Sequence, residues 1–326
     1  MAQPELDYFR KRGIALKAEV TEGTDSVPTA VANGIRLFEG SSGTEFDTVE
    51  RKIDRAHFTN HPFGVANKRA FIEGGMELYP PATPGAVATS SIDGEIALLI
   101  AGMAVTKNLG AKTTTYNPIS AAIPSASAYW WHVDYHKQVL GCRANLTGVK
   151  MAIGERFMAQ LRLQGTYTNV TEDAIPAITL PTTIPVIAQF DNSETNINID
   201  GGGDLLVWAK ELSLDFGNTL TSKEYTSKKV HAPTDRMATW SLRIARTDLS
   251  DFNPWTVRDA GTLFEARMRT YVADPGLYSE IGIRGQIEQI TETDIDGDLG
   301  LELTGRCIAS DAGGDEFYLL FGDTTP

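Results

Sequence analysis

Cysteine and long apolar runs are both scarce in this sequence. Only Cys142 and Cys307 occur among 326 residues, and neither stands in a CxxC or Cys/His spacing. This scarcity argues against a disulfide framework and a cysteine-based zinc site, and we expect both thiols to be reduced and buried. The most apolar run, Ile96–Val105, is far shorter than the ~20 residues that cross a bilayer. We therefore expect a buried helix there and no membrane partner.

Basic side chains are outnumbered by acidic ones. The sequence holds 29 Lys and Arg against 42 Asp and Glu, a formal net charge of -13. Proteins that wrap nucleic acid need Lys and Arg to displace counterions from phosphates, so this charge argues against tight binding. The N-terminal stretch, Met1–Gly13, is charged where a secretion signal needs apolar residues. We expect the protein to be made and kept in the cytoplasm.

The length and composition of the chain are typical of a folded protein, and we expect a mainly β fold with two cores of about 150 residues each. Apolar residues make up 42% and no tract is low in complexity. Short apolar or aromatic runs predict strands, most clearly where apolar and polar residues alternate. The polar stretch Asp47–Asn67 predicts a long loop, and Ser90 or Ser91 predicts the start of a helix that runs to Met103. The expected strands are Ile35–Phe38, Phe71–Tyr79, Ala128–His136, Lys137–Asn145 and Arg156–Tyr167.

The second half of the sequence repeats the first in order and spacing. Phe216 lies as far beyond Trp208 as Phe46 lies beyond Phe38, and Leu301–Gly305 matches Leu161–Gly165. Arg236–Ile244 matches Arg69–Glu77, and Asn253–Phe264 matches the helix after Ser90. The shared order predicts a tandem duplication. Pro176, Pro181 and Pro185 mark a semi-extended connector between the halves.

No motif of catalysis or metal binding stands out. His132 and His136 form an HxxxH pair, but flanking aromatics predict a strand, where residues four apart are too far apart for a tight site. Asp294–Asp298 lacks the glycine and glutamate of a calcium loop, so Asp296-Gly297 predicts a hairpin turn. Gly201–Gly203 lacks the context of a phosphate-binding loop. We expect no cofactor, no metal and no enzyme activity.

Two other functions are open at this point. A carbohydrate-binding or adhesion β-sandwich would use exposed aromatic rings, and a β-rich hydrolase would assemble scattered Asp, Glu and His side chains in space. The tryptophans lie inside apolar runs, which favours the core for most of them. These tryptophans are Trp130, Trp131, Trp208, Trp240 and Trp255.

Several segments together resemble the tail tube proteins of siphophages, the phages with long non-contractile tails. Near the N-terminus these are Lys17-Ala-Glu19, Gly23-Thr-Asp25 and Pro28. Val49-Glu-Arg51, Lys68-Arg69 and Leu161–Tyr167 continue the likeness, and Glu211–Asn218 with Phe252-Asn-Pro254 carries it into the second half. The resemblance covers nearly the whole chain, and its motifs are structural.

The resemblance implies β-sandwich or half-barrel modules, each with one flanking α-helix. It predicts an arm over residues 1–34, a tail-tube module over 35–175, a linker over 176–199 and a second module over 200–326. Since rings of this family present six modules, we expect three copies per ring, with a hexamer as the alternative. Stacked rings in the virion tail would conduct double-stranded DNA without binding it. The implied partners are further copies and the tape-measure, tail terminator and distal tail proteins, with assembly in the bacterial cytoplasm.

Two sets of residues are candidates for function in such a tube. An acidic or neutral channel lets the genome pass, and Glu73, Glu77 and Glu302 are the expected carboxylates of the channel wall. The N-terminal arm and the Asp47–Asn67 loop are the expected contacts between rings. The residues expected there are Lys17, Glu19, Asp25, Val49, Glu50, Arg51 and Phe58.

Overall fold

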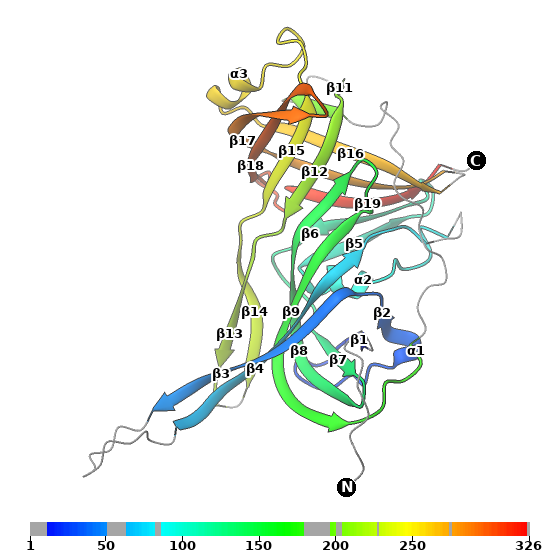
Figure 1. Ribbon diagram of the computed structural model, residues 1–326, viewed down its shortest axis with the longest axis vertical. Helices are drawn as coiled ribbons and strands as arrows, with labels where there is room; N and C mark the ends of the chain where they lie inside the picture. Colours follow the sequence, from blue (N-terminus) through cyan, green and yellow to red (C-terminus); the bar gives the residue numbers. More distant parts are fainter. Residues whose placement is uncertain are drawn as a thin grey trace.

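Antiparallel β-strands build the protein, as a computed structural model shows (Figure 1). The structure describes residues 12–50, 63–81, 86–178, 196–199, 204–226, 228–273 and 276–324. Within these ranges, 17 strands belong to one sheet and two form a separate hairpin. The mainly β fold expected from the sequence is confirmed. Most of the predicted linker and Gly201–Gly203 lie outside the described residues.

Six strands, here called the N-terminal series, lie side by side in the order β1, β7, β8, β9, β4, β3. Every neighbouring pair is antiparallel. Helix α2, Glu95–Ile100, lies between β4 and β7 in the sequence. The strands are β1 Arg12–Ala18, β3 Phe38–Glu50, β4 Phe63–Glu77, β7 Ala126–His132, β8 Tyr135–Ala152 and β9 Met158–Glu172.

A second set of six, the C-terminal series, has the order β10, β16, β17, β18, β15, β12. These pairs are also antiparallel, and helix α3, Pro254–Asp259, precedes β16 as α2 precedes β7. The strands are β10 Asn196–Ile199, β12 Ala209–Asp215, β15 Thr239–Ala245, β16 Phe264–Ala273, β17 Leu277–Ile295 and β18 Asp298–Cys307. Both series therefore have the same strand order and the same place for a helix.

The remaining elements fill in around the two series. β13 and β14 form a hairpin that extends β12 and β15, as the outer parts of β3 and β4 extend the N-terminal series. β19 pairs with β17 and, across the halves, with β6. These elements are α1 Ala30–Asn33, β2 Gly34–Ile35, β5 Met103–Asn108, β6 Thr113–Pro118, β11 Asp204–Leu206, β13 Asn218–Glu224, β14 Lys229–Arg236 and β19 Phe317–Asp323.

Strand registers show which residues are equivalent in the two series. Leu163 of β9 pairs with Ile72 of β4, which pairs with Ser42 of β3. Leu303 of β18 likewise pairs with Leu242, which pairs with Leu212 of β12. Positions 42 and 212 differ by 170, as Phe38 and Trp208 do. The predicted match of the Arg69 and Arg236 segments differs by 167 and is wrong by three residues, because side chains of similar type recur along both strands.

Three local predictions are wrong. Asp47–Asn67 was expected to be a loop, but residues 47–50 and 63–67 extend β3 and β4. The helix begins after Gly94 and ends at Ile100, because Gly94 adopts a positive φ of 75° and β5 begins at Met103. Ser91 contacts the Glu95 side chain and makes no backbone cap. The expected strand Ala128–His136 is a hairpin whose turn falls at Val133, where φ is 52°.

One hydrophobic core extends through both series. Its fully buried side chains include Ile72 and Leu163 from the N-terminal series and Leu242 and Leu303 from the C-terminal series. Alternation in β9 directs Leu161 and Leu163 to this core and leaves Gln160 and Arg162 on the other face of the sheet. We expected two cores of similar size, and most buried apolar side chains instead belong to this one cluster, beside a small second cluster of Ala15, Ala30 and Trp131. Cys142 is buried and Cys307 half-buried, and neither is in a disulfide.

Candidate functional site

The two series are joined by direct pairing of β12 with the end of β8. Glu211–Leu214 lies antiparallel to Val149–Ala152, with Leu214 opposite Val149. The contact continues along β8, where the Phe216 amide donates to the Leu146 carbonyl at 3.1 Å. On the polar face, Lys150 Nζ lies 3.4 Å from a carboxylate oxygen of Glu211. The sheet therefore passes from one half of the chain to the other without a break at this point.

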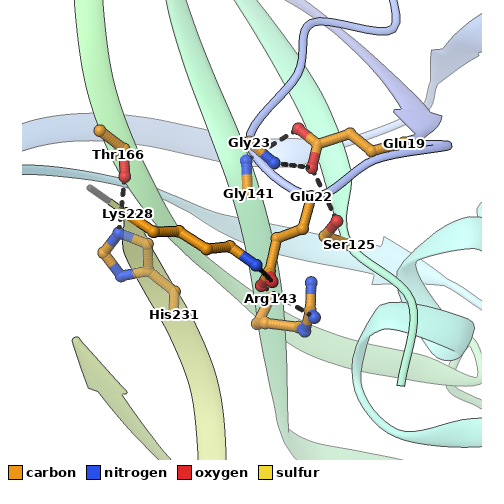
Figure 2. Close-up of polar contacts among 9 residues, drawn as sticks. All are labelled: Glu19, Glu22, Gly23, Ser125, Gly141, Arg143, Thr166, Lys228 and His231. Carbon is orange, nitrogen blue, oxygen red and sulfur yellow. Dashed lines mark hydrogen bonds and ion pairs between the residues drawn. The ribbon is translucent and has the colours of Figure 1, made fainter. Parts of the chain in front are cut away.

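A polar cluster holds the β13–β14 hairpin against the N-terminal series (Figure 2). The Glu22 carboxylate lies between two cations, 3.1 Å from Arg143 Nη2 on β8 and 2.9 Å from Lys228 Nζ at the hairpin end. Arg143 is buried, and burial alone lowers the pKa of its guanidinium, an effect that the nearby Glu22 opposes. Because an unpaired buried cation is costly, Arg143 holds the Glu22 carboxylate in place, and Glu22 in turn contacts Lys228 at the hairpin end.

His231 of β14 is a second anchor of the same hairpin. It is 1% exposed, and its Nε2 lies 3.0 Å from the Thr166 hydroxyl of β9 (Figure 2). Burial, together with the positive charges of Arg69 and Lys229, lowers the pKa of this imidazole to about 4. The ring is therefore neutral at neutral pH, and protonation opposes docking of the hairpin.

This shifted pKa predicts a loss of stability in mild acid. Below pH 6.5 the unfolded chain protonates this ring, whereas the folded chain resists protonation until about pH 4. Stability should therefore fall as the pH drops through that window, by about 3 kcal/mol from this group. In His231→Gln, the free energy of unfolding, measured by chemical denaturation at a series of pH values, should depend less steeply on pH than in the unmodified protein. His132→Gln is the control, and an unchanged slope in His231→Gln would contradict the assignment.

The predicted arm residues make contacts inside the chain. The Glu19 carboxylate accepts hydrogen bonds from Ser125 at 2.7 Å and from the Gly141 amide at 2.8 Å (Figure 2). The Asp25 carboxylate accepts one from the Tyr129 hydroxyl at 2.5 Å. Lys17, at the end of β1, is exposed. The described part of the arm segment therefore includes a strand, β1, whose centre is buried in the sheet.

The other predicted contact residues belong to the β3–β4 hairpin, which projects from the body of the molecule (Figure 1). Val49 is exposed on β3. Glu50 is the last residue of β3, and its side chain lies outside the described part, as do Arg51 and Phe58 entirely.

Two strand edges correspond to the β8–β12 junction but carry no partner among the described residues. β3 corresponds to β12. Among the described residues, β3 pairs with β4 and with no other strand. The end of β17 corresponds to the end of β8. Met158 of β9 is equivalent to Asp298 of β18, since each lies five residues before the equivalent Leu163 and Leu303. Met158 pairs with Lys150 and Asp298 pairs with Ile295, so Lys150 is equivalent to Ile295, and the residue before each, Val149, to Asp294. From Gln289 to Ile295, β17 pairs only with β18. Within the described residues, β8 and β12 therefore form one paired junction, and the two strand edges of an equivalent junction, β3 and the end of β17, are not paired with each other.

The predicted channel carboxylates lie in different surroundings. Glu73 is on the polar face of the N-terminal series, 2.8 Å from Arg162 Nη1, and Glu45 lies 3.8 Å from the same guanidinium. Glu302 is on β18 and accepts a hydrogen bond from the Ser241 hydroxyl at 3.2 Å. Glu77 is 5% exposed, and burial raises the pKa of its carboxyl group. Arg162 on this face thus lies beside two carboxylates.

The residues considered for other functions have structural neighbours. Trp130, Trp131 and Trp240 are buried, Trp255 packs on the core, and Trp208 is exposed. His132 and His136 lie on opposite strands of the β7–β8 hairpin, and His136 Nδ1 lies 3.2 Å from Asp173. The described residues contain no group of three or more His, Cys, Asp or Glu placed to hold a metal. None of the helices described is long and apolar enough to cross a membrane.

Sequence reasoning missed the junction and the cluster around Glu22. Both depend on contacts between residues more than 60 positions apart, such as Leu214 with Val149 and Lys228 with Glu22. The only available signal was the repeat itself, which makes β12 the counterpart of β3. The hairpin turn at Asp296-Gly297 was predicted and is confirmed, with both residues at positive φ.

The chain matches a known protein family. A family model described as phage tail tube protein matches residues 10–278, most of the chain. A search of curated proteins found no match.

Proposed function

Because the chain belongs to the phage tail tube protein family, whose members are structural proteins that assemble into the tube of the virion tail, we propose that three copies form each ring of a long non-contractile tail. Each ring would present six similar strand series, two from each copy. The observation that carries this proposal is the repeated strand order, in which the β8–β12 junction inside the chain has an open counterpart at its two ends.

The internal junction supplies the geometry for closing the ring. β3 of one copy would pair with the end of β17 of the next, as β12 pairs with β8 inside each chain. Thr44 is equivalent to Leu214 and Asp294 to Val149, so these two residues would lie opposite each other between copies. Pairing at each junction would leave no free edge in the closed sheet, which removes the usual route to aggregation.

The polar face of the closed sheet would line the channel. Glu73 and Glu302 remain the proposed channel carboxylates, while the buried position of Glu77 removes it from that role in our proposal. Arg162 is flanked by Glu73 and Glu45, and Lys150 by Glu155 and Glu211. Cations paired in this way offer little to DNA phosphates, so the wall would let double-stranded DNA slide past.

The remaining partners follow from the place of a tube in a tail. A tape-measure protein would occupy the channel before DNA does, and terminator and distal tail proteins would bind the two ends. Assembly would take place in the bacterial cytoplasm and needs no cofactor. Lys17, Glu19, Asp25, Val49, Glu50, Arg51 and Phe58 remain the proposed contacts between rings.

Electron microscopy of assembled tubes tests the ring. Tubes grown from the purified 326-residue chain should show threefold rings with pseudo-sixfold appearance in a helical reconstruction. A true sixfold ring made of six such chains would reject the arrangement. Isolated particles at high concentration, in place of rings or tubes, would count against self-assembly of this chain alone.

A further inference from the structure

Three large apolar side chains are exposed on the C-terminal series and the turn beside it. Trp208 is 73% exposed, Ile153 54% and Leu299 48%. Exposed tryptophan is uncommon on a protein that acts alone, and tryptophan is enriched among residues that dominate the energy of protein contacts. Trp208 is equivalent to Phe38 of the N-terminal series, which lies under the Arg156 guanidinium at 4.8 Å. Trp208 is also aromatic, but its side chain is mostly exposed to solvent.

Main-chain hydrogen bonds place these residues at the same end of neighbouring strands. The Trp208 carbonyl accepts a hydrogen bond from the Ala245 amide at 2.8 Å. The amide of the following residue, Arg246, donates to the Leu299 carbonyl at 3.1 Å. The Ile153 amide donates to the carbonyl of Lys210, two residues from Trp208, at 3.1 Å. We call these three residues, Ile153, Trp208 and Leu299, the apolar rim.

Position at a strand end decides which neighbour the rim can meet. If rings close through strand edges, edges face copies in the same ring, and strand ends face the rings above and below. β12 begins at the rim, and the β13–β14 and β3–β4 hairpins extend toward the opposite end of the molecule (Figure 1). The rim and the hairpins therefore lie at opposite ends of each copy, as a head-to-tail stack requires.

Both ends expose apolar side chains. Next to the rim, the turn Asp294–Asp298 carries three aspartates, of which Asp296 lies 2.7 Å from Lys210 Nζ. The described strands of the β3–β4 hairpin expose Val49, Phe63 and Val65. Apolar side chains at both ends, with polar side chains around them, favour a specific contact between these two ends.

We propose that the apolar rim is a ring-stacking surface that binds the β3–β4 hairpin of a copy in the next ring. This proposal rests on the ring described above and adds the contact that joins one ring to another. Trp208 is its central anchor. Val49, Phe63 and Val65 are the exposed apolar side chains that the hairpin brings to it.

Substitution of the anchor separates stacking from ring closure. In Trp208→Glu, purified protein should form single rings of three, with at least a tenfold loss of stacked tubes in negative-stain images and in sedimentation. Trp208→Phe should keep the tubes because an aromatic ring is retained. Leu109→Glu is the matched control, since Leu109 is similarly exposed, at 70%, on the turn between β5 and β6. It should form tubes like the unmodified chain.

The outcomes divide clearly. Tubes of normal length from Trp208→Glu, or an equal loss from Leu109→Glu, would overturn the stacking surface. So would a Trp208→Glu protein that stays folded by circular dichroism but yields only monomers, because Trp208 would then act within the ring. The ring itself is judged on the unmodified protein, by the threefold symmetry of its rings, so its failure is recognised separately.

Discussion

Cysteines introduced at Thr44 and Asp294 should cross-link neighbouring copies into covalent rings of three. These positions are the counterparts of Leu214 and Val149, which lie directly opposite each other in the β8–β12 ladder. Opposite residues of an antiparallel pair have Cα atoms about 4.5–5.5 Å apart, within the range that a disulfide spans. After mild oxidation of assembled tubes, most of the double variant should run as a trimer on a non-reducing denaturing gel.

Three controls make this result specific. Thr44→Cys alone and Asp294→Cys alone should stay monomeric, which also tests the native Cys142 and Cys307. Leu214→Cys with Val149→Cys should close inside one chain and leave it monomeric. A ladder of six bands from the Thr44 and Asp294 double variant would support a hexamer. Absence of any cross-link in assembled tubes would refute the predicted register.

Removal of the carboxylates beside Arg162 should make the channel hold DNA. Glu73→Gln with Glu45→Gln leaves the charge of Arg162 without the two carboxylates that lie 2.8 and 3.8 Å away. Each unpaired cation that contacts a DNA phosphate makes the plot of the logarithm of the DNA-binding constant against the logarithm of salt concentration steeper by about 0.9. The effect repeats in every ring, so DNA ejection from variant particles should be strongly slowed at low salt and recover as salt is raised.

The matched control removes the cation as well. Glu73→Gln and Glu45→Gln combined with Arg162→Gln should restore the ejection rate, because no charge is then exposed to the phosphates. Ejection can be followed by the fluorescence of a DNA-binding dye after receptor triggering. An ejection rate equal to that of unmodified particles in the carboxylate variant would show that this face of the sheet does not line the channel.

Local pattern was enough to predict the repeat and several of the strands, although it missed the outer parts of β3 and β4 and the turn between β7 and β8. Alternation in the segment around Leu161 and Leu163 identified a half-buried strand, and the structure buries both residues. The spacing of Phe38 and Trp208 predicted an equivalence that the registers reproduce. Such predictions succeed because a strand shows its buried face every second residue, whatever its partners are.

Long-range pairing was beyond that pattern. Nothing in the residues of β12 specifies that Leu214 faces Val149, since backbone hydrogen bonds are the same for any partner strand. Glu77 lies four residues after Glu73 on the same strand, yet one is buried and the other partly exposed, because they have different neighbours. Glu22 gave no sign of its bridge to Arg143 and Lys228.

The sequence by itself determined the mainly β fold, the duplicated order and the excess of acidic charge. Only the tertiary structure decided which edges are joined, which are open and which carboxylates lie beside cations. The physical reason is that burial periodicity is written locally along each strand. Edge pairing and ion pairing instead depend on residues that the chain brings together from more than 60 positions away, as it does Leu214 and Val149 or Glu22 and Arg143.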